Sequence, residues 1–60
     1  MKKQVSELKR GDRIELLNGE IAKVLRVIQD ETIKEHSTIY YENGSRNFAL
    51  TNEEIEILSK

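Results

Sequence analysis

Cysteine, proline and tryptophan are absent from this chain of 60 residues, and it contains only three glycines. Without cysteine there is no disulfide framework and no thiolate zinc site, which are the usual supports of very small domains. Aromatic residues make up only 5% of the chain. We therefore expect a single domain over residues 1–60 that folds on aliphatic packing alone, without a metal or a cofactor.

Long hydrophobic runs are also missing. The basic start of the chain, residues 1–4, is followed by no apolar segment of the kind found in signal peptides. No uncharged apolar run approaches the length that crosses a bilayer. The sequence predicts a soluble, cytoplasmic protein that does not bind a membrane.

The charges are unevenly distributed along the chain, although the net charge is only −1. Residues 1–26 carry seven Lys or Arg and four acids, whereas residues 27–60 carry three Lys or Arg and seven acids. Proteins that bind nucleic acid by its phosphates normally show a pronounced basic excess or stripe. Only the first half offers one, and a mixed, solvated surface explains the same pattern.

Two Asn-Gly pairs, Asn18-Gly19 and Asn43-Gly44, lie between runs of alternating apolar and polar residues. Asn-Gly tolerates the positive φ angles of a type I′ turn, so it is a strong signal for a hairpin with a two-residue loop. The chain therefore contains two predicted hairpins, which favours a small all-β domain.

Loops of two residues fix the expected register of both hairpins. In the first, Leu16 pairs with Ile21, and the face of Ile14, Leu16 and Ile21 is directed toward the core. In the second, Tyr40 lies opposite Asn47 and Ile39 lies opposite Phe48. Ile39, Phe48 and Leu50 then share the inward face, and alanine at Phe48 is expected to unfold the domain.

Residues 20–29 do not alternate simply, because Lys23 and Arg26 interrupt opposite faces of the strand. A long strand that is bent or bulged buries different faces along its length and accommodates this pattern. The alternative is a helix capped by Asn18, since Ile21, Val24 and later apolar residues follow helical spacing. The many β-branched residues and the competing turn favour the strand.

The remaining segments complete a five-stranded arrangement. Strands are expected at residues 13–17, 20–29, 37–41, after Gly44, and at 55–58. Residues 5–8 have the spacing of a single helical turn, residues 30–36 form a polar loop, and residues 51–54 form a short capped turn.

The segment 8–16 (LKRGDRIEL), followed by Gly19 and by residues 24–27 (VLRV), resembles the opening of SH3-like domains of the KOW and Tudor-like type. In that group a Gly-Asp turn leads into the first strand and a glycine turn separates it from the second. The resemblance implies a small SH3-like barrel with a short helical turn before the last strand. Freestanding domains of this size are also similar to short accessory proteins of phages and plasmids, which bind host proteins or nucleic acids.

Residues that could carry catalysis or hold a metal form no recognisable constellation. His36 is the only histidine, and the acids near it do not follow the spacing of a zinc or calcium site. The acids Glu53, Glu54 and Glu56 read as a solvated edge, because general-acid chemistry needs a carboxyl shielded from water. We expect no enzymatic activity, no cofactor and no metal.

The predicted binding surface is the outward face of the second hairpin, with Tyr40, Asn47 and Thr38. An exposed tyrosine brings amphipathic contact area with few rotatable bonds, so it is a suitable anchor for a protein partner. The alternative for Tyr40 is a structural role beneath the loop of residues 30–36. A non-catalytic module that binds a protein is the leading hypothesis.

A KOW-like nucleic-acid module is the alternative function. It would contact phosphates through the basic residues of the first half. These residues are Lys9, Arg10, Arg13, Lys23 and Arg26.

Overall fold

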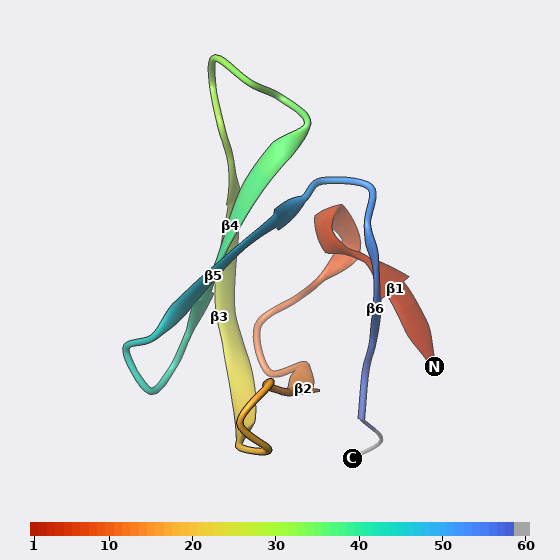
Figure 1. Ribbon diagram of the computed structural model, residues 1–60, viewed down its shortest axis with the longest axis vertical. Helices are drawn as coiled ribbons and strands as arrows, with labels where there is room; N and C mark the ends of the chain where they lie inside the picture. The colour runs from red at the N-terminus through yellow and green to blue at the C-terminus, as the bar shows by residue number, and fades with distance from the viewer. Residues whose placement is uncertain (59–60) are drawn as a thin grey trace.

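The computed structural model describes residues 1–58, which form β-strands and one turn of 3₁₀-helix (Figure 1). A four-stranded antiparallel sheet has the order β2-β3-β4-β5, and β1 pairs with β6 in a separate two-stranded sheet. The elements are β1 (Lys2–Gln4), η1 (Val5–Glu7), β2 (Arg13–Glu15), β3 (Ile21–Gln29), β4 (His36–Tyr41), β5 (Arg46–Leu50) and β6 (Glu54–Glu56). The prediction of a small all-β protein is confirmed.

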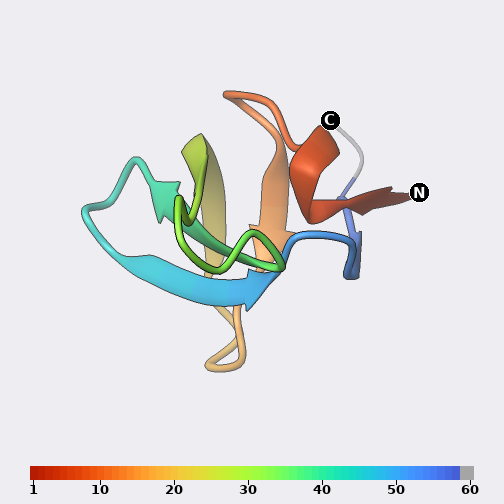
Figure 2. The same ribbon diagram turned by 90° about the horizontal axis from the view of Figure 1, so that it is seen from above.

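The larger sheet curls, and η1, β1 and β6 lie together on one side of it (Figure 2). Val5, from η1, is fully buried and joins the core between the two sheets. The buried residues of this core are Val5, Leu8, Ile14, Ala22, Val24, Ile39, Tyr41 and Ile57.

The two ends of the chain differ from the expected five-stranded arrangement, because residues 1–58 contain six strands. The additional strand, β1, is polar and three residues long, so it carries no alternation that a sequence pattern could reveal. The predicted turn at residues 5–8 is confirmed, and the Leu8 N–H donates to the Val5 carbonyl at 3.2 Å. The expected short helical turn before the last strand is wrong, because the chain makes a β-turn there, in which the Glu53 N–H donates to the Leu50 carbonyl at 3.0 Å.

Both hairpin loops contain three residues, not the two expected. In the first, the Leu16 N–H donates to the Glu20 carbonyl at 2.7 Å and the Gly19 N–H donates to the Leu16 carbonyl at 2.9 Å. Gly19 and Gly44 have φ angles of +87° and +91°, whereas no other residue type among residues 1–58 has a positive φ. A type I′ turn requires positive φ at both central residues. Each loop is therefore a type I turn followed by a left-handed glycine.

The longer loop shifts the first hairpin by one residue. Ile14 pairs with Ala22, and Glu15 pairs with Ile21. A shift of one residue exchanges the two faces of a strand. The predicted pairing of Leu16 with Ile21 is wrong, and Ile21 is exposed while Ala22 is buried.

The second hairpin is shifted in the same way. Ile39 pairs with Asn47, and Thr38 pairs with Phe48. Ile39 is buried as expected, but Phe48 and Leu50 are on the opposite face of β5 and are 77% and 53% exposed. The prediction of a core position for Phe48 and Leu50 is therefore wrong.

Strand β3 carries the predicted bulge, where its register against β4 shifts between Val24 and Arg26. Before the bulge Ala22 and Val24 are buried, and after it Val27 faces the core and pairs with Ile39. The extra residue changes which positions face inward, and it increases the local bend of the strand. The strand interpretation of residues 20–29 is confirmed, and the helical alternative is wrong.

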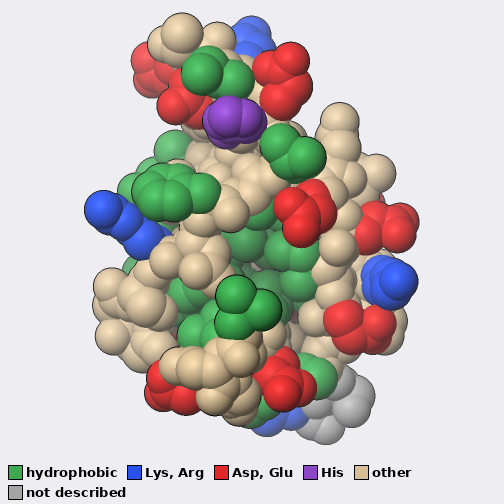
Figure 3. Space-filling view, in the orientation of Figure 1, with side chains coloured by type: hydrophobic (Ala, Val, Ile, Leu, Met, Phe, Trp, Pro, Cys, Tyr) green, Lys and Arg blue, Asp and Glu red, His purple; other side chains and the backbone are tan. Residues whose placement is uncertain are grey.

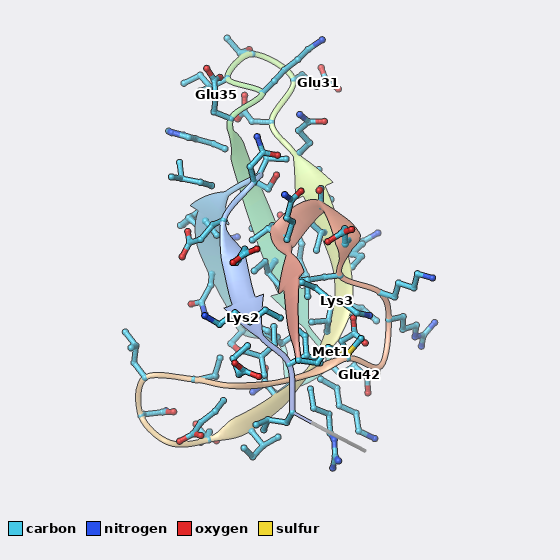
Figure 4. All side chains as sticks on the ribbon, turned by 90° about the vertical axis from the view of Figure 1, so that its right-hand side faces the viewer. Met1, Lys2, Lys3, Glu31, Glu35 and Glu42 are labelled. Atoms are coloured by element: carbon cyan, nitrogen blue, oxygen red, sulfur yellow. The ribbon has the colours of Figure 1, made fainter. Side chains whose placement is uncertain are left out.

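Asp12 links β1 to the turn that precedes β2. Its Oδ2 accepts hydrogen bonds from the Lys9 N–H at 2.9 Å and from Lys3 Nζ at 3.2 Å. The side chains of Lys3 and Asp12 are only 23% and 18% exposed. Lys2 and Lys3 leave β1 on opposite sides, with Lys3 directed toward this turn (Figure 4). The backbone N–H of Lys9 and then the Lys3 ammonium hold the pKa of Asp12 below its usual value of 3.8.

Replacing Asp12 with asparagine is expected to lower the free energy of unfolding at neutral pH by about 1 to 2 kcal/mol, because charge-assisted hydrogen bonds are lost. The lowered pKa means that the carboxylate contributes fully above pH 3.8 and loses its contribution as the pH falls through its folded-state pKa. Urea unfolding of the wild type and the variant across this range measures the difference. A difference that stayed constant with pH would contradict the ion pair.

Candidate functional site

The outer face of β3, β4 and β5 carries three rows of paired side chains that point away from the core. One row joins Arg26, Tyr40 and Arg46, and the next joins Ile28, Thr38 and Phe48. The third pairs His36 with Leu50. We refer to the following residues as the outer sheet surface: Arg26, Ile28, His36, Thr38, Tyr40, Arg46, Phe48 and Leu50.

Two aromatic rings on this surface each contact an arginine. The Arg26 guanidinium carbon lies 5.7 Å from the centre of the Tyr40 ring, and that of Arg46 lies 5.8 Å from the centre of the Phe48 ring. These distances are within the range of cation–π attraction. Phe48 is nevertheless largely exposed, and Tyr40 is half-buried. The rings are thus held in place while their free faces and edges remain available for contact.

A shallow pocket of about 410 Å³ borders the outer sheet surface at the start of β4. Its lining includes His36, Thr38, Phe48, Leu50 and Asp30. The Asp30 carboxylate accepts the backbone N–H groups of Thr32 and Ile33 at 2.8 and 2.7 Å. These bonds, first that of Ile33, hold the pKa of Asp30 below its usual value of 3.8. The pocket combines apolar side chains with two carboxylates, those of Asp30 and Glu53.

The structure brings Thr38 and Tyr40 to the outer sheet surface but not Asn47. Asn47 lies beside Ile39 on the other face of β5, and its Nδ2 donates to the Tyr41 hydroxyl oxygen at 3.0 Å. The expected Asn47 position opposite Tyr40 is taken by Arg46. Tyr40 has Arg26 and Arg46 as its cross-strand neighbours, which places it away from the loop that precedes β4.

Alanine at Asn47 is expected to lower the free energy of unfolding by about 1 kcal/mol, because it removes the hydrogen bond to the hydroxyl of the buried residue Tyr41. Burial raises the pKa of Tyr41, and the Asn47 hydrogen bond acts in the opposite direction. A spectrophotometric titration of tyrosine and a urea unfolding curve would report the change. Loss of partner binding with unchanged stability would instead make Asn47 a contact residue.

The five basic residues predicted to contact phosphates are divided between two places. Lys9, Arg10 and Arg13 line a hollow of about 510 Å³, which also contains Asp12. Lys23 pairs with Arg13 across β2 and β3, whereas Arg26 lies against Tyr40 on the outer sheet surface. The hollow therefore has a carboxylate among its cations, and Arg26 belongs to a different surface.

Sequence reasoning missed Arg46 and Phe48 because both depend on the length of the second hairpin loop. Within the described part of the chain, no group of three His, Cys, Asp or Glu side chains is placed to hold a metal ion. Residues 1–58 also contain no helix long and apolar enough to cross a membrane.

Comparison with known proteins gives no match to a family model, a curated protein or a solved structure. The candidate site is accordingly defined by its own geometry. Two arginine-supported aromatic rings and two exposed aliphatic residues, Ile28 and Leu50, lie on one face of a sheet.

Proposed function

We propose that this protein is a non-catalytic binding module that takes a protein partner on the outer sheet surface. The observation that carries the proposal is the exposure of Phe48, 77%, at the centre of β5, the last strand of the sheet. Exposed apolar surface beside polar residues is characteristic of interaction sites. Tyrosine, phenylalanine and arginine are also the residue types enriched in protein interfaces.

The SH3-like type, with its KOW and Tudor-like relatives, is part of the proposal. It is supported by the order of β2, β3, β4 and β5, followed by a turn and by β6, after which the chain returns to β2. The return is the bridge between Arg13 and Leu58. Strand β1 would be an addition to that arrangement. The fold type does not identify a partner, because the same barrel serves many functions.

A cytoplasmic location is likewise proposed, and the absence of cysteine supports it. Proteins of reducing compartments do not depend on disulfides, whereas very small secreted domains usually do.

Nucleic acid is the second candidate partner, because aromatic rings with adjacent guanidinium groups can stack on bases. The pairs of Arg26 with Tyr40 and of Arg46 with Phe48 have this chemistry. The overall charge of −1 and the separation of the basic residues favour a protein partner instead.

The two candidates are separated by capturing the partner from source cells, with and without nuclease, and by measuring affinity against salt. Four phosphate contacts would weaken binding by about 100-fold between about 50 and 200 mM salt, whereas a mainly apolar protein interface would change little. We expect a nuclease-resistant partner and a shallow salt dependence. Loss of capture after nuclease treatment, together with a steep salt dependence, would replace the protein by a nucleic acid.

A further inference from the structure

Strand β5 has a free edge. It is the last strand of the order β2-β3-β4-β5, and within residues 1–58 it pairs only with β4. The hydrogen bond from the Tyr41 N–H to the Ser45 carbonyl sets the alternation of the ladder. Accordingly Asn47 and Ala49 bond to β4, whereas the backbone groups of Arg46 and Phe48 point away from it.

At the end of this edge, the backbone groups of Leu50 are already hydrogen-bonded within the chain. The Leu50 N–H donates to Glu53 Oε1 at 3.3 Å, and the Leu50 carbonyl accepts the Glu53 N–H at 3.0 Å. Arg46 and Phe48 are therefore the two edge positions of β5 whose backbone groups are available to another strand.

An apolar hollow of about 590 Å³ lies beside this edge and is visible as a recess lined by hydrophobic side chains in Figure 3. Strands β4 and β5 contribute Ile39, Tyr41 and Ala49 to its lining. Residues of β2, of the loop that follows it and of β6 form the opposite wall, with Ile14, Leu16 and Ile55. We refer to this recess as the inner hollow.

The charges in the inner hollow have one sign. Glu15 and Glu53 belong to its lining, and the described lining residues include no Lys or Arg. Both carboxylate side chains are on exposed residues. An occupant that is apolar along its length and cationic near its ends would complement this arrangement.

We propose that an extended segment of a partner protein adds to the edge of β5 as a further strand and fills the inner hollow. Its backbone bonds to the free groups of Arg46 and Phe48, and alternate apolar side chains enter the hollow. Lysine or arginine residues at its ends lie near Glu15 and Glu53. A strand added at the ordinary spacing of about 4.8 Å would lie between β5 and the opposite wall. This site uses the edge and inner face of β5, and of the residues that line the inner hollow only Phe48 also belongs to the outer sheet surface.

The probe is a capped peptide of alternating valine and threonine with a lysine at each end, and the control peptide has glutamate in place of both lysines. We expect the lysine peptide to protect the amide protons of Arg46 and Phe48 from exchange with solvent, as seen by NMR. The amides of Asn47 and Ala49 are expected to be protected already in the free protein. The glutamate peptide should bind at least about tenfold more weakly at low salt.

Two variants at one position test the contribution of the edge N–H. Phe48→Ala and Phe48→Pro both remove the ring, but only the proline removes the N–H, and proline is tolerated where an edge N–H faces solvent. Phe48→Pro should bind the lysine peptide about fivefold more weakly than Phe48→Ala. If circular dichroism shows that Phe48→Pro is unfolded, the exchange measurement on the wild type decides.

The proposal is overturned if the lysine peptide does not bind, if it binds without protecting Arg46 and Phe48, or if the glutamate peptide binds equally well. It is also overturned if sedimentation shows a dimer in which these two amides are protected without peptide, because a second copy would then occupy the edge. Tyr40→Ala is the matched control and should leave peptide binding unchanged. Failure of this site is therefore distinguishable from failure of the outer sheet surface.

Discussion

Alanine in place of Ile39 is expected to leave most of the protein unfolded at ambient temperature. Ile39 is 1% exposed and pairs with Val27 and Asn47 in the centre of the curled sheet. Truncation of a buried isoleucine costs about 2 to 5 kcal/mol. A domain of this size without disulfides or metal has a total stability of only about 3 to 5 kcal/mol. Urea unfolding followed by far-ultraviolet circular dichroism measures the loss.

Phe48→Ala is the matched control, because the sequence pattern alone predicts that Ile39 and Phe48 are both buried. The change is expected to cost less than about 1 kcal/mol, since Phe48 lies outside the core and contacts Arg46 on the surface. A Phe48→Ala variant as unfolded as Ile39→Ala would mean that the hairpin has the register of a two-residue loop, in which both side chains are buried.

The register of the hairpins could not be predicted, because Asn-Gly fits both a two-residue loop and the last two positions of a three-residue loop. In the structure Asn18 Oδ1 accepts the Glu20 N–H at 2.9 Å, and Asn43 Oδ1 accepts the Ser45 N–H at 2.9 Å. Each asparagine side chain thus spans the left-handed glycine and stabilises the longer loop. These local hydrogen bonds are small in energy, but they decide the face of every residue in the following strand.

Strand β3 was more predictable because its constraint comes from burial over many residues. Lys23 and Arg26 cannot both point outward in a regular strand while Ala22, Val24 and Val27 point inward. One extra residue resolves the conflict, and the structure has its register shift between Val24 and Arg26. By contrast, β1 has no apolar alternation, and its pairing with β6 depends on the rest of the fold.

The candidate site was partly predictable for the same reason. The inward position of Ile39 determines the orientation of all of β4, so Thr38 and Tyr40 point outward in either register. The position of β5 relative to β4 depends on the length of the loop. In the observed register Arg46 and Phe48 lie on the outer sheet surface, and Asn47 lies on the opposite face of β5. The tyrosine anchor was therefore accessible to sequence reasoning, whereas its aromatic and cationic neighbours on β5 were not.

Removing both aromatic side chains of the outer sheet surface is expected to abolish most of the binding of a protein partner. Tyr40→Ala combined with Phe48→Ala should raise the dissociation constant by about 30-fold or more, which is equivalent to about 2 kcal/mol. The reason is that aromatic anchors buried in an interface dominate its binding energy. Stability should fall by only about 1 kcal/mol, since neither ring belongs to the core. The comparison variant is Leu17→Ala, which removes a fully exposed apolar side chain that lines the inner hollow and does not belong to the outer sheet surface. Calorimetry with the captured partner measures both variants. A double variant that binds like the wild type, beside a weakened Leu17→Ala, would move the binding site from the outer sheet surface to the inner hollow.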